Sequence, residues 1–588
     1  MTKPQTVIEA SWEVVNKVGG IYTVVRTKAE LLVNTYKQYV LVGPLFPGRH
    51  NVEFTEQAPP ERYVHVFEEL RQEGIQCVYG VWNIPGNPQV VLLNAQHSHI
   101  DVNAVKGQLW EQFGVDSLRA AYEYDEPLRW AWAVGRFMEL MQSSTDEPIV
   151  GHFHEWMAGL ALLYLRMKKS RVRSVFTTHA TMLGRTISGS TDINLYDSLP
   201  DLDFPRLAKE LHVEDKYTTE LACAKNAHVF TTVSEITGIE AEHVLLRKPD
   251  VLLFNGICRS QYPDVNDSSP MHIRARERMR DFLNYYFFSH YSFDLEHSVT
   301  FFASGRYEYR NKGLDVFTKA LGKLNYELKK VPDSKTVIVF YFIPGDTQGI
   351  KTEVLEERQA FSAMQSYLDK NADDVVRRIM RQAQRIDSLS AKDILSEEAY
   401  QHVKQLAKAL AHAGNPPLVT HNIPGEEHDP IVAGFRAHGL LNRAEDKVKV
   451  VRYPVYLTGK DGLLDLTYDE AVAGSHLGVF PSYYEPWGYT PMEAAAMGVP
   501  AITTDLAGFG RFVQTQQEKG VFVLKRYNRS EQDVVEDLFV MLKEFCQKNR
   551  SERRELKAAA QKLSEQTDWQ VFIKHYYDAH QRAYESKD

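Results

Sequence analysis

Cysteine is scarce in the sequence, and long apolar runs are missing. The four cysteines among 588 residues (Cys77, Cys223, Cys258 and Cys546) are far apart and form no C-x-x-C pair. This spacing argues against a disulfide framework and is typical of reduced thiols in the cytosol. No run approaches the roughly 20 apolar residues that a membrane-spanning helix needs, and the first residues lack the apolar stretch of a signal peptide. We therefore expect a soluble, cytoplasmic protein with no membrane partner.

An excess of positive charge is also absent. Asp and Glu total 77 against 68 Lys and Arg, which gives a net charge of -9. That balance argues against a protein that coats nucleic acid, although it leaves room for a local basic pocket. A G-x-G-x-x-G pattern is missing after the first predicted strand, at residues 6–10. We therefore expect neither nucleic acid nor a nicotinamide cofactor as a partner.

Short apolar runs alternate with helical patterns in two parts of the chain. The first series extends from residues 6–10 to residues 251–254, and the second from residues 300–304 to residues 501–503. Strands that alternate with helices predict a parallel sheet covered by helices. Because 588 residues are too many for one hydrophobic core, we expect two or more α/β domains. The polar and aromatic segment at residues 258–298 is interpreted as the connection between them.

A charged, helix-prone segment interrupts the second series at residues 352–414. It is too long for a crossover between neighbouring strands, so we predict a helical insertion. Two interpretations of this insertion stay open at this point: a solvated helical hairpin and a contact between subunits.

The stretch at residues 482–500, S-Y-Y-E-P-W-G-Y-T-P-M-E-A-A-A-M-G-V-P, follows a short apolar run. It predicts a strand, a tight loop and a helix, with Thr490 as N-cap, Pro491 at the first helical position and Glu493 completing a capping box. Such a loop lies at the carboxyl ends of parallel strands, where ligands bind, and the N–H groups of the helix start attract phosphate. Glu485 lies in the loop, so its carboxylate can face a bound group.

The same stretch carries a family resemblance. Glu485 and Glu493, with E-P-W-G-Y-T-P between them, resemble the signature of retaining glycosyltransferases of the GT-B type, which have two facing Rossmann-like domains. The longer motif S-Y-Y-E-P-W-G-Y-T-P resembles the glycogen synthases of animals and fungi more closely still. The resemblance implies an α/β fold of two Rossmann-like domains across a cleft. It also implies transfer of glucose from UDP-glucose to the non-reducing end of glycogen or another α-1,4-glucan, with retention of configuration.

The resemblance further implies domain limits and an assembly. We expect an N-terminal, acceptor-side domain at residues 1–265, completed by a C-terminal helix at residues 566–588. The nucleotide-sugar-binding domain is expected at residues 266–565, with the insertion at residues 352–414. Families of this kind assemble through such helices, which favours a homo-oligomer, and among the possible sizes a tetramer.

A transferase that uses a nucleotide sugar must bind a diphosphate, either through a metal ion held by a D-x-D motif or through Arg and Lys. The D-x-D motif at residues 201–203 falls at a predicted helix start, where the helix dipole favours acidic side chains. Residues 302–313, F-A-S-G-R-Y-E-Y-R-N-K-G, instead place Arg306 and Lys312 after the first strand of the second domain. By the resemblance both are diphosphate ligands, and no metal or other cofactor is expected.

Two histidine motifs follow predicted strands in the first domain. In T-T-H-A-T-M-L-G-R, the resemblance places His179 beside the transferred glucose and Arg185 on phosphate or sugar. In H-F-H-E-W, His152 and His154 have a spacing that suits a metal ion, but no third ligand is evident. We interpret them as part of the cleft floor.

Further substrate-binding residues rest on the resemblance. Lys17 in K-V-G-G-I-Y is expected to face the sugar phosphate, and Gly19 and Gly20 let the backbone approach it. Tyr468 is expected to stack on the uracil ring, and Glu493 to bind the ribose hydroxyls, in competition with its capping role. The other expected ligands follow the central glutamate: Gly488, Tyr489 and Thr490.

The mechanism is left partly open. Retaining glycosidases use two carboxylates, one of them a nucleophile, but the sequence offers one loop carboxylate, Glu485, without a partner at a recognisable spacing. The resemblance implies attack by the acceptor on the face that UDP leaves, with Glu485 offsetting oxocarbenium charge; a nucleophilic Glu485 is the alternative. The expected catalytic residues are Glu485, His179, Arg306 and Lys312. Alternative functions are a related transferase with another donor, such as ADP-glucose, or another acceptor, and a non-catalytic glucan- or nucleotide-binding protein.

The sequence also departs from the resembling enzymes. Animal and fungal members carry phosphorylated tails, which we do not expect here. Members that respond to glucose 6-phosphate have a dense arginine run on a late helix, whereas residues 547–557 contain only Arg550, Arg553 and Arg554. Activation by glucose 6-phosphate is therefore expected to be weak or absent.

Overall fold

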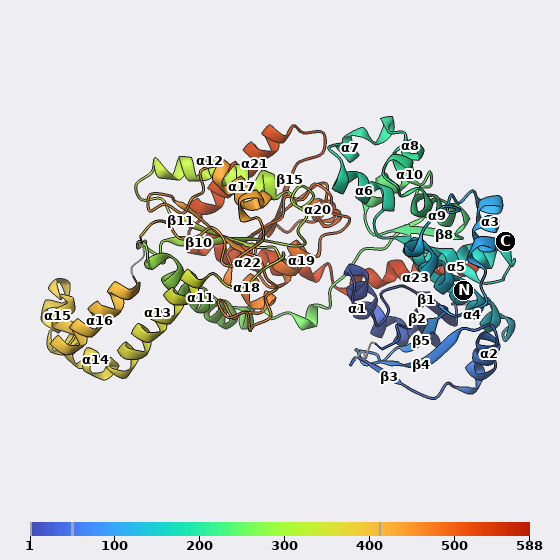
Figure 1. Ribbon diagram of the computed structural model, residues 1–588, viewed down its shortest axis with the longest axis horizontal. Coiled ribbons are helices and arrows are strands. Elements are labelled where there is room, and N and C mark those ends of the chain that lie inside the picture. The colour runs from blue at the N-terminus through green and yellow to red at the C-terminus, as the bar shows by residue number, and fades with distance from the viewer. Residues whose placement is uncertain (1–2, 49–51, 411–412, 588) are drawn as a thin grey trace.

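Two β-sheets organise the chain, and each forms the centre of one lobe. The computed structural model describes residues 3–48, 52–410 and 413–587. Figure 1 shows the N-terminal sheet in the blue and teal lobe and the second sheet in the green to orange lobe. The predicted α/β architecture of two domains is confirmed.

The first sheet has the strand order β3-β4-β5-β2-β1-β6-β7-β8-β9. Strands β5 to β9 in this order pair in parallel, as predicted, whereas β3 and β4 form an antiparallel edge. The antiparallel edge was not predicted, because its short strands carry no clear alternation with helices. The strands are β1 (Thr6–Ala10), β2 (Gln38–Pro44), β3 (Phe54–Glu56), β4 (Gln76–Trp82), β5 (Gln89–Asn94), β6 (Val150–His154), β7 (Arg173–Thr178), β8 (Val229–Thr232) and β9 (Val251–Leu252).

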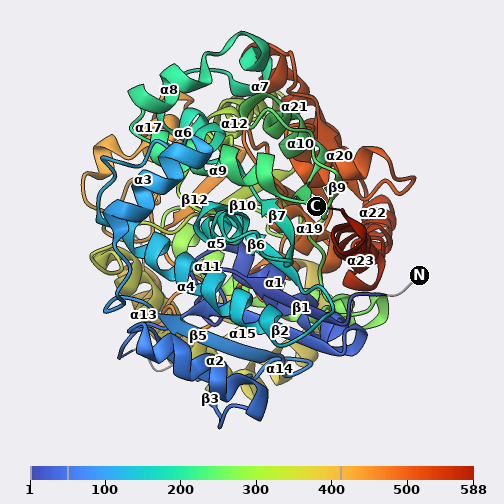
Figure 2. The same ribbon diagram turned by 90° about the vertical axis from the view of Figure 1, so that its right-hand side faces the viewer.

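Alternate residues of β1 belong to different hydrophobic clusters, so both faces of the first sheet are covered. Ile8 and Ala10 lie in a cluster with residues of α4 and α5, and Val7 lies in a cluster with residues of α1 and α23. Figure 2 turns this lobe toward the viewer. Its helices are α1 (Gly20–Thr35), α2 (Glu61–Gln72), α3 (Val102–Phe113), α4 (Tyr122–Ser143), α5 (Glu155–Met167), α6 (Met182–Ser190), α7 (Leu195–Ser198), α8 (Phe204–Glu210), α9 (Glu214–Asn226) and α10 (Glu235–Val244).

The second sheet has the order β12-β11-β10-β13-β14-β15, and all its pairs are parallel. Its central strands consist of apolar residues on both faces, which is why the sequence predicted them clearly. The strands are β10 (Ser298–Ser304), β11 (Thr336–Phe342), β12 (Val448–Tyr453), β13 (Leu477–Val479), β14 (Ala501–Thr504) and β15 (Val521–Leu524). The helices of this domain are α12 (Leu314–Lys329), α17 (Pro430–Ala437), α18 (Tyr468–Gly474), α19 (Tyr489–Ala496), α20 (Gly508–Gln514), α21 (Glu531–Gln547) and α22 (Arg550–Glu565).

The segment between the sheets is more than a connection. Most of it forms α11 (Val265–Phe288), which packs against the second domain. The hydroxyl of Tyr285 donates to the carbonyl of Leu463 (3.2 Å), and that of Tyr286 to the carbonyl of Pro417 (2.6 Å). This helix is therefore held by the second domain rather than free between the two.

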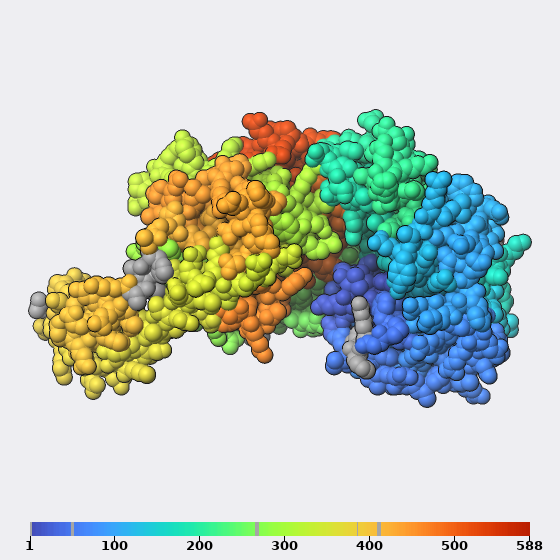
Figure 3. Space-filling view, viewed as in Figure 1, coloured from blue at the N-terminus to red at the C-terminus, as the bar shows by residue number. Residues whose placement is uncertain are grey.

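The predicted helical insertion projects from the second lobe. Figures 1 and 3 show its helices extending away from the rest of the molecule. They are α13 (Thr352–Lys370), α14 (Ala372–Arg381), α15 (Ala391–Ile394) and α16 (Glu397–Leu410); residues 411–412 of the predicted range lie outside the described residues. Val376 and Met380 on α14 and Ile386 beyond it are exposed apolar side chains.

The C-terminal helix returns to the first lobe. Helix α23 (Trp569–Glu585) follows α22 of the second domain and packs beside α1 and the first sheet (Figure 1). Trp569 is buried, and its indole N–H donates to Thr27 Oγ1 at 2.7 Å. His580, also on α23, hydrogen-bonds to the hydroxyl of Tyr36 at 2.8 Å. The last helix therefore ties the two lobes together.

Candidate functional site

The loop between β13 and α19 lies where the two domains meet, beside the hollow visible between the lobes in Figure 3. The hydroxyl of Tyr484 donates to Glu240 Oε1 of the first domain at 3.0 Å. Ser234 Oγ of the first domain donates to the carbonyl of Pro486 at 2.6 Å. Glu485 lies between these two contacts in the chain. Its loop is therefore held by both domains, at the carboxyl ends of both sheets, where ligands are expected to bind.

The start of α19 differs from the prediction. The helix begins at Tyr489 with Gly488 as its N-cap, and no side chain caps it. The predicted capping box of Thr490 and Glu493 is thus wrong, because Gly488 has φ 110°, a conformation that favours glycine, and the helix starts two residues earlier than predicted. Glu493 therefore has no capping role and is half-buried; desolvation, followed by the nearby charge of Asp469, raises its pKa to about 7.

An ion pair inside this cleft joins Glu485 to Lys312. Glu485 Oε2 and Lys312 Nζ are 2.5 Å apart, and the two side chains are only 18% and 14% exposed. Arg306 is placed differently: its side chain is 68% exposed and pairs with Glu308 at 3.1 Å. Of the two predicted diphosphate ligands, one contacts the central carboxylate directly and the other lies at the rim.

In the first domain, the loop before α1 holds a carboxylate that was not predicted from the sequence. Glu13 accepts the backbone N–H groups of Gly19 and Tyr22, both at 2.8 Å. Burial raises its pKa, while these two N–H groups and the charges of Arg185 and Arg306 oppose the rise. The predicted Lys17, Gly19 and Gly20 are exposed here, and Glu13 stands in W-E-V-V-N-K-V-G-G, close enough in sequence to have been considered.

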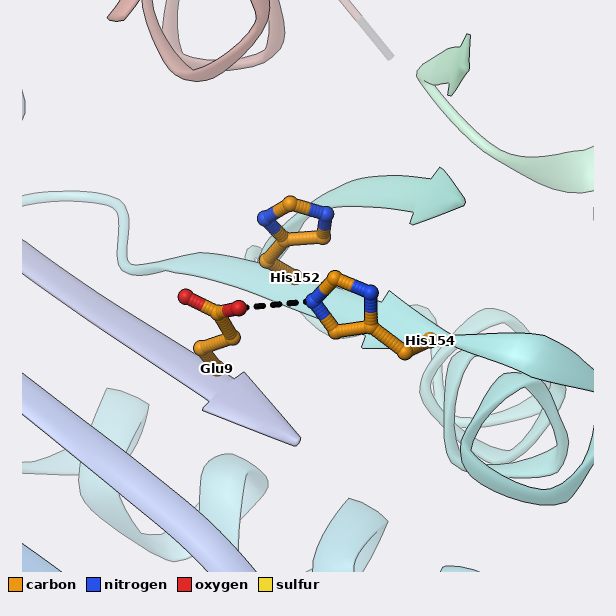
Figure 4. Close-up of side chains that lie close together, drawn as sticks. All are labelled: Glu9, His152 and His154. Atoms are coloured by element: carbon orange, nitrogen blue, oxygen red, sulfur yellow. Dashed lines mark hydrogen bonds and ion pairs between the residues drawn. The ribbon is translucent and has the colours of Figure 1, made fainter. Parts of the chain in front are cut away.

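A chain of buried polar side chains leads from the core to the predicted His179. His154 bonds through Nδ1 to His179 Nε2 (2.9 Å) and through Nε2 to Glu9 Oε1 (2.7 Å). Figure 4 shows Glu9 and His154 joined in this way, with His152 beside them. Glu9 also pairs with Lys28 at 2.5 Å, and neither side chain of this pair is exposed.

Glu9 is the third possible metal ligand that the motif H-F-H-E-W lacked. Ligand atoms of Glu9, His152 and His154 lie within 4.8 Å of one another. However, the Lys28 ammonium already neutralises Glu9, and both ring nitrogens of His154 have protein partners. The arrangement therefore supports a hydrogen-bonded network more than a metal site. Glu9 could not be predicted as a partner of the two histidines, because it lies on β1 and they lie on β6, far away in the sequence.

Three further carboxylates, of which Glu220 and Glu240 are fully buried, hold the segment that carries His179. Glu155 accepts the backbone N–H of His179 at 2.7 Å, Glu220 accepts that of Met182 at 2.8 Å, and Glu240 accepts that of Thr181 at 3.1 Å. Burial raises the pKa of Glu155 to about 7 and that of Glu220 to about 8. Glu155 follows the two histidines in H-F-H-E-W and was predicted with them as part of the cleft floor, whereas Glu220 and Glu240 come from helices with an ordinary pattern and were not predicted.

A comparison with known proteins now decides the family. A family model described as glycogen synthase matches residues 9–587. The chain belongs to the glycogen synthase family. This confirms the resemblance inferred from S-Y-Y-E-P-W-G-Y-T-P and the predicted class, a glycosyltransferase.

Similar proteins agree with this family. The chain is 36% identical over 600 residues to glycogen [starch] synthase isoform 1 of Saccharomyces cerevisiae, covering 97% of this chain and 85% of that one. It is 36% identical over 584 residues to the liver glycogen [starch] synthase of Homo sapiens, covering 97% and 82%. Among solved structures, the catalytic domain of starch synthase IV from Arabidopsis thaliana, bound to ADP and acarbose, aligns with TM-score 0.53 at 13% identity over 100% of both chains. That similarity supports the fold.

The remaining predicted positions of this family member are distributed around the same cleft. Tyr468, at the start of α18, bonds through its hydroxyl to Ser304 at the end of β10 (3.1 Å). The charge of Glu493 acts on both Tyr468 and Tyr489, so these three side chains lie near one another. In the D-x-D motif, Asp203 caps α8 by accepting the N–H of Arg206 at 3.1 Å, the structural role that the helix dipole favoured.

A basic cavity lies in the second lobe, between α11 and α22. Its volume is about 760 Å³, and its lining includes Arg276, Arg280, Arg553, Arg554 and Lys557. Burial, followed by the charges of Arg276, Arg553 and Arg554, lowers the pKa of Lys557 to about 7. The arginines of α22 were predicted from the sequence as a group, whereas those of α11 were not, because they belong to a distant segment of the chain.

None of the described helices is long and apolar enough to cross a membrane.

Proposed function

We propose that this glycogen synthase family member transfers glucose from UDP-glucose to the non-reducing end of glycogen or another α-1,4-glucan, with retention of configuration. The observation that carries the proposal is the Glu485–Lys312 ion pair of the second domain, on the side that faces the first domain, within a family match over residues 9–587. Lys312 supplies positive charge for the departing diphosphate beside the carboxylate that offsets charge on the sugar.

The other expected site residues take roles on either side of this pair. Arg306 and Arg185 bring further positive charge toward the phosphates, and His179 lies against the sugar. Tyr468 stacks on the uracil ring, and Glu493, free of a capping role, binds the ribose hydroxyls. Lys17 and the backbone at the start of α1 face the sugar phosphate, and the backbone at the start of α19 faces the diphosphate: Gly19, Gly20, Gly488, Tyr489 and Thr490.

The hydrogen bonds of the neighbouring carboxylates support a role for Glu485 as a stabiliser of positive charge rather than as a nucleophile. Glu155, Glu220 and Glu240 are occupied by hydrogen bonds to the segment at residues 178–182. Glu13 is occupied by the start of α1. The pair of free carboxylates that a double-displacement mechanism uses is therefore not formed among these residues. We propose that the acceptor hydroxyl enters on the face that UDP leaves, and that the departing phosphate takes its proton.

Radiolabelled glucose tests the function directly. With UDP-[14C]glucose and glycogen, the protein is expected to transfer label to the precipitable polysaccharide, and ADP-glucose is expected to be a much poorer donor. Preference for ADP-glucose would support the related transferase. Absence of transfer from every donor, with glucan or nucleotide binding retained, would support the non-catalytic alternative.

We also propose the predicted domain limits, assembly and location. The two sheets, and the return of α23, support domains at residues 1–265 with 566–588 and at residues 266–565; residues 1–2, 49–51, 411–412 and 588 of these ranges lie outside the described residues. The projecting insertion, with apolar Val376 and Met380 exposed, supports a homo-oligomer, with a tetramer favoured. The scarcity of cysteine supports the cytoplasm.

Glucose 6-phosphate is expected to raise the activity less than about fivefold, the low end of typical allosteric coupling. The reason is the short arginine run on α22, although Arg276 and Arg280 of α11 add charge to the same cavity. Initial rates with and without glucose 6-phosphate at low UDP-glucose measure the effect. A larger rise would show that the cavity, rather than the arginine count of one helix, controls the response.

A further inference from the structure

We propose that Glu9 and His154 are positioning residues that hold the His179 ring with its proton on Nε2, so that Nδ1 accepts a hydrogen bond from the sugar. This inference rests on the proposed function, which places His179 beside the transferred glucose. Its physical basis is the hydrogen-bonded series Lys28–Glu9–His154–His179, which crosses from α1 through β1 and β6 to the end of β7.

The series has a direction because the Glu9 carboxylate can only accept hydrogen bonds. Burial acts to raise the pKa of Glu9, but the Lys28 ammonium and the hydrogen bond from His154 hold that pKa well below its usual value. Glu9 is therefore a carboxylate, which has no proton to donate. It accepts from Lys28 Nζ (2.5 Å), from the hydroxyl of Tyr39 (2.5 Å) and from His154 Nε2 (2.7 Å).

The proton positions on the two histidines follow in sequence. Burial lowers the pKa of His154, so the ring is neutral and carries one proton. That proton lies on Nε2, because Glu9 can only accept, and Nδ1 is left as an acceptor. The contact of 2.9 Å from His154 Nδ1 to His179 Nε2 therefore requires the proton on His179 Nε2. Burial also lowers the pKa of His179, so this neutral ring has a bare Nδ1.

The backbone of His179 is held as firmly as its ring. Its N–H donates to Glu155 Oε1 at 2.7 Å. Glu155 itself has φ 64°, a backbone conformation that costs a non-glycine residue energy and is concentrated at functional sites. His179 is 8% exposed, and no described residue hydrogen-bonds to its Nδ1. Nδ1 is thus the ring atom available to a ligand, as an acceptor from a sugar hydroxyl and not as a proton donor.

The first test observes the proton directly, in the whole wild-type protein. Histidine labelled with 15N in the imidazole ring is incorporated, and the His179 signals are assigned by their loss in His179→Gln. Near neutral pH we expect a protonated Nε2 and an unprotonated Nδ1 for His179. The opposite tautomer, or a doubly protonated ring, would overturn the proposal.

The second test separates positioning from general packing. In His154→Gln, the amide N–H can still donate to Glu9, but nothing accepts from His179. We expect kcat to fall about 10- to 100-fold, the size that a small misplacement in an active site causes, with a smaller change in KM for UDP-glucose. In His154→Asn, the amide oxygen can occupy the place of Nδ1, so this variant should retain more kcat than His154→Gln.

His580→Gln is the matched control. His580 is equally buried and bonds to His152 and Tyr36, but it makes no contact with His179. Its kcat should stay within about threefold of the wild-type value, as expected away from the reacting groups. Equal kcat in folded His154→Gln and His580→Gln would refute positioning, whereas a selective loss in His154→Gln supports it. A wild-type protein that transfers no glucose would refute the proposed function, and the tautomer would still decide the state of His179.

Discussion

Glu485→Gln is expected to lower kcat for glucose transfer about 10²- to 10³-fold, comparable to removal of one electrostatic group from an active site. The amide has the shape of the carboxylate, so the loop can keep its contacts through Tyr484 and Pro486 to the first domain. What it loses is the negative charge that faces positive charge developing on the sugar. The measurement is initial rate under saturating UDP-glucose and glycogen.

Binding of UDP should respond in the opposite direction. Because Lys312 is released from its 2.5 Å ion pair with Glu485, its ammonium becomes available to the diphosphate. We expect UDP to bind Glu485→Gln as tightly as the wild type or more tightly, as measured by titration calorimetry. Glu308→Gln, which removes a similar charge beside Arg306, is the control and should leave kcat nearly unchanged. Equal losses of turnover and UDP affinity in Glu485→Gln would contradict the proposed role.

Lys28→Met is expected to destabilise the first domain by about 3–5 kcal/mol, the cost of leaving a buried charge without its partner. Lys28 and Glu9 are both fully buried and 2.5 Å apart, and the ammonium also lies 5.0 Å from the centre of the Tyr576 ring. Denaturant unfolding, analysed for the transition of the first domain, measures the loss. The exposed pair Lys319–Glu531 supplies the control, and Lys319→Met should cost less than about 1 kcal/mol.

The pH dependence of Lys28→Met provides a second measurement. Without Lys28, the pKa of Glu9 should rise above its unfolded value, because burial then lacks its main opposing charge. A raised carboxyl pKa means that the folded state binds the proton more tightly, so stability is lost as pH rises. The deficit should therefore be larger at neutral pH than near the unfolded pKa of a glutamate. Adding Glu9→Gln to Lys28→Met should recover part of the stability, and a deficit unaffected by pH or by Glu9→Gln would contradict the account.

Local sequence patterns were sufficient to predict many of the strands and the helical insertion. The strands predicted at residues 6–10, 251–254, 300–304 and 501–503 agree with β1, β9, β10 and β14 to within two residues at each end, because buried parallel strands consist of continuous apolar runs. The helical insertion followed from its charge and length. The antiparallel edge and the packing of α11 on the second domain were not predicted, since both depend on contacts between segments distant in the chain.

The features of the site also fall into those that the sequence predicted and those that only the tertiary structure showed. The sequence determined that Glu485 and Lys312 follow the central strands of one sheet and His179 a strand of the other, because a motif specifies which residue ends a strand. Only the tertiary structure brought Glu485 onto Lys312, placed Arg306 at the rim, and freed Glu493 from capping by starting α19 at Tyr489. It also decided that Glu9 supports His179, since their connection crosses neighbouring strands that are separated by more than a hundred residues of sequence. Hydrogen bonds across a parallel sheet depend on strand order, and strand order is fixed by packing over the whole domain rather than by any local pattern.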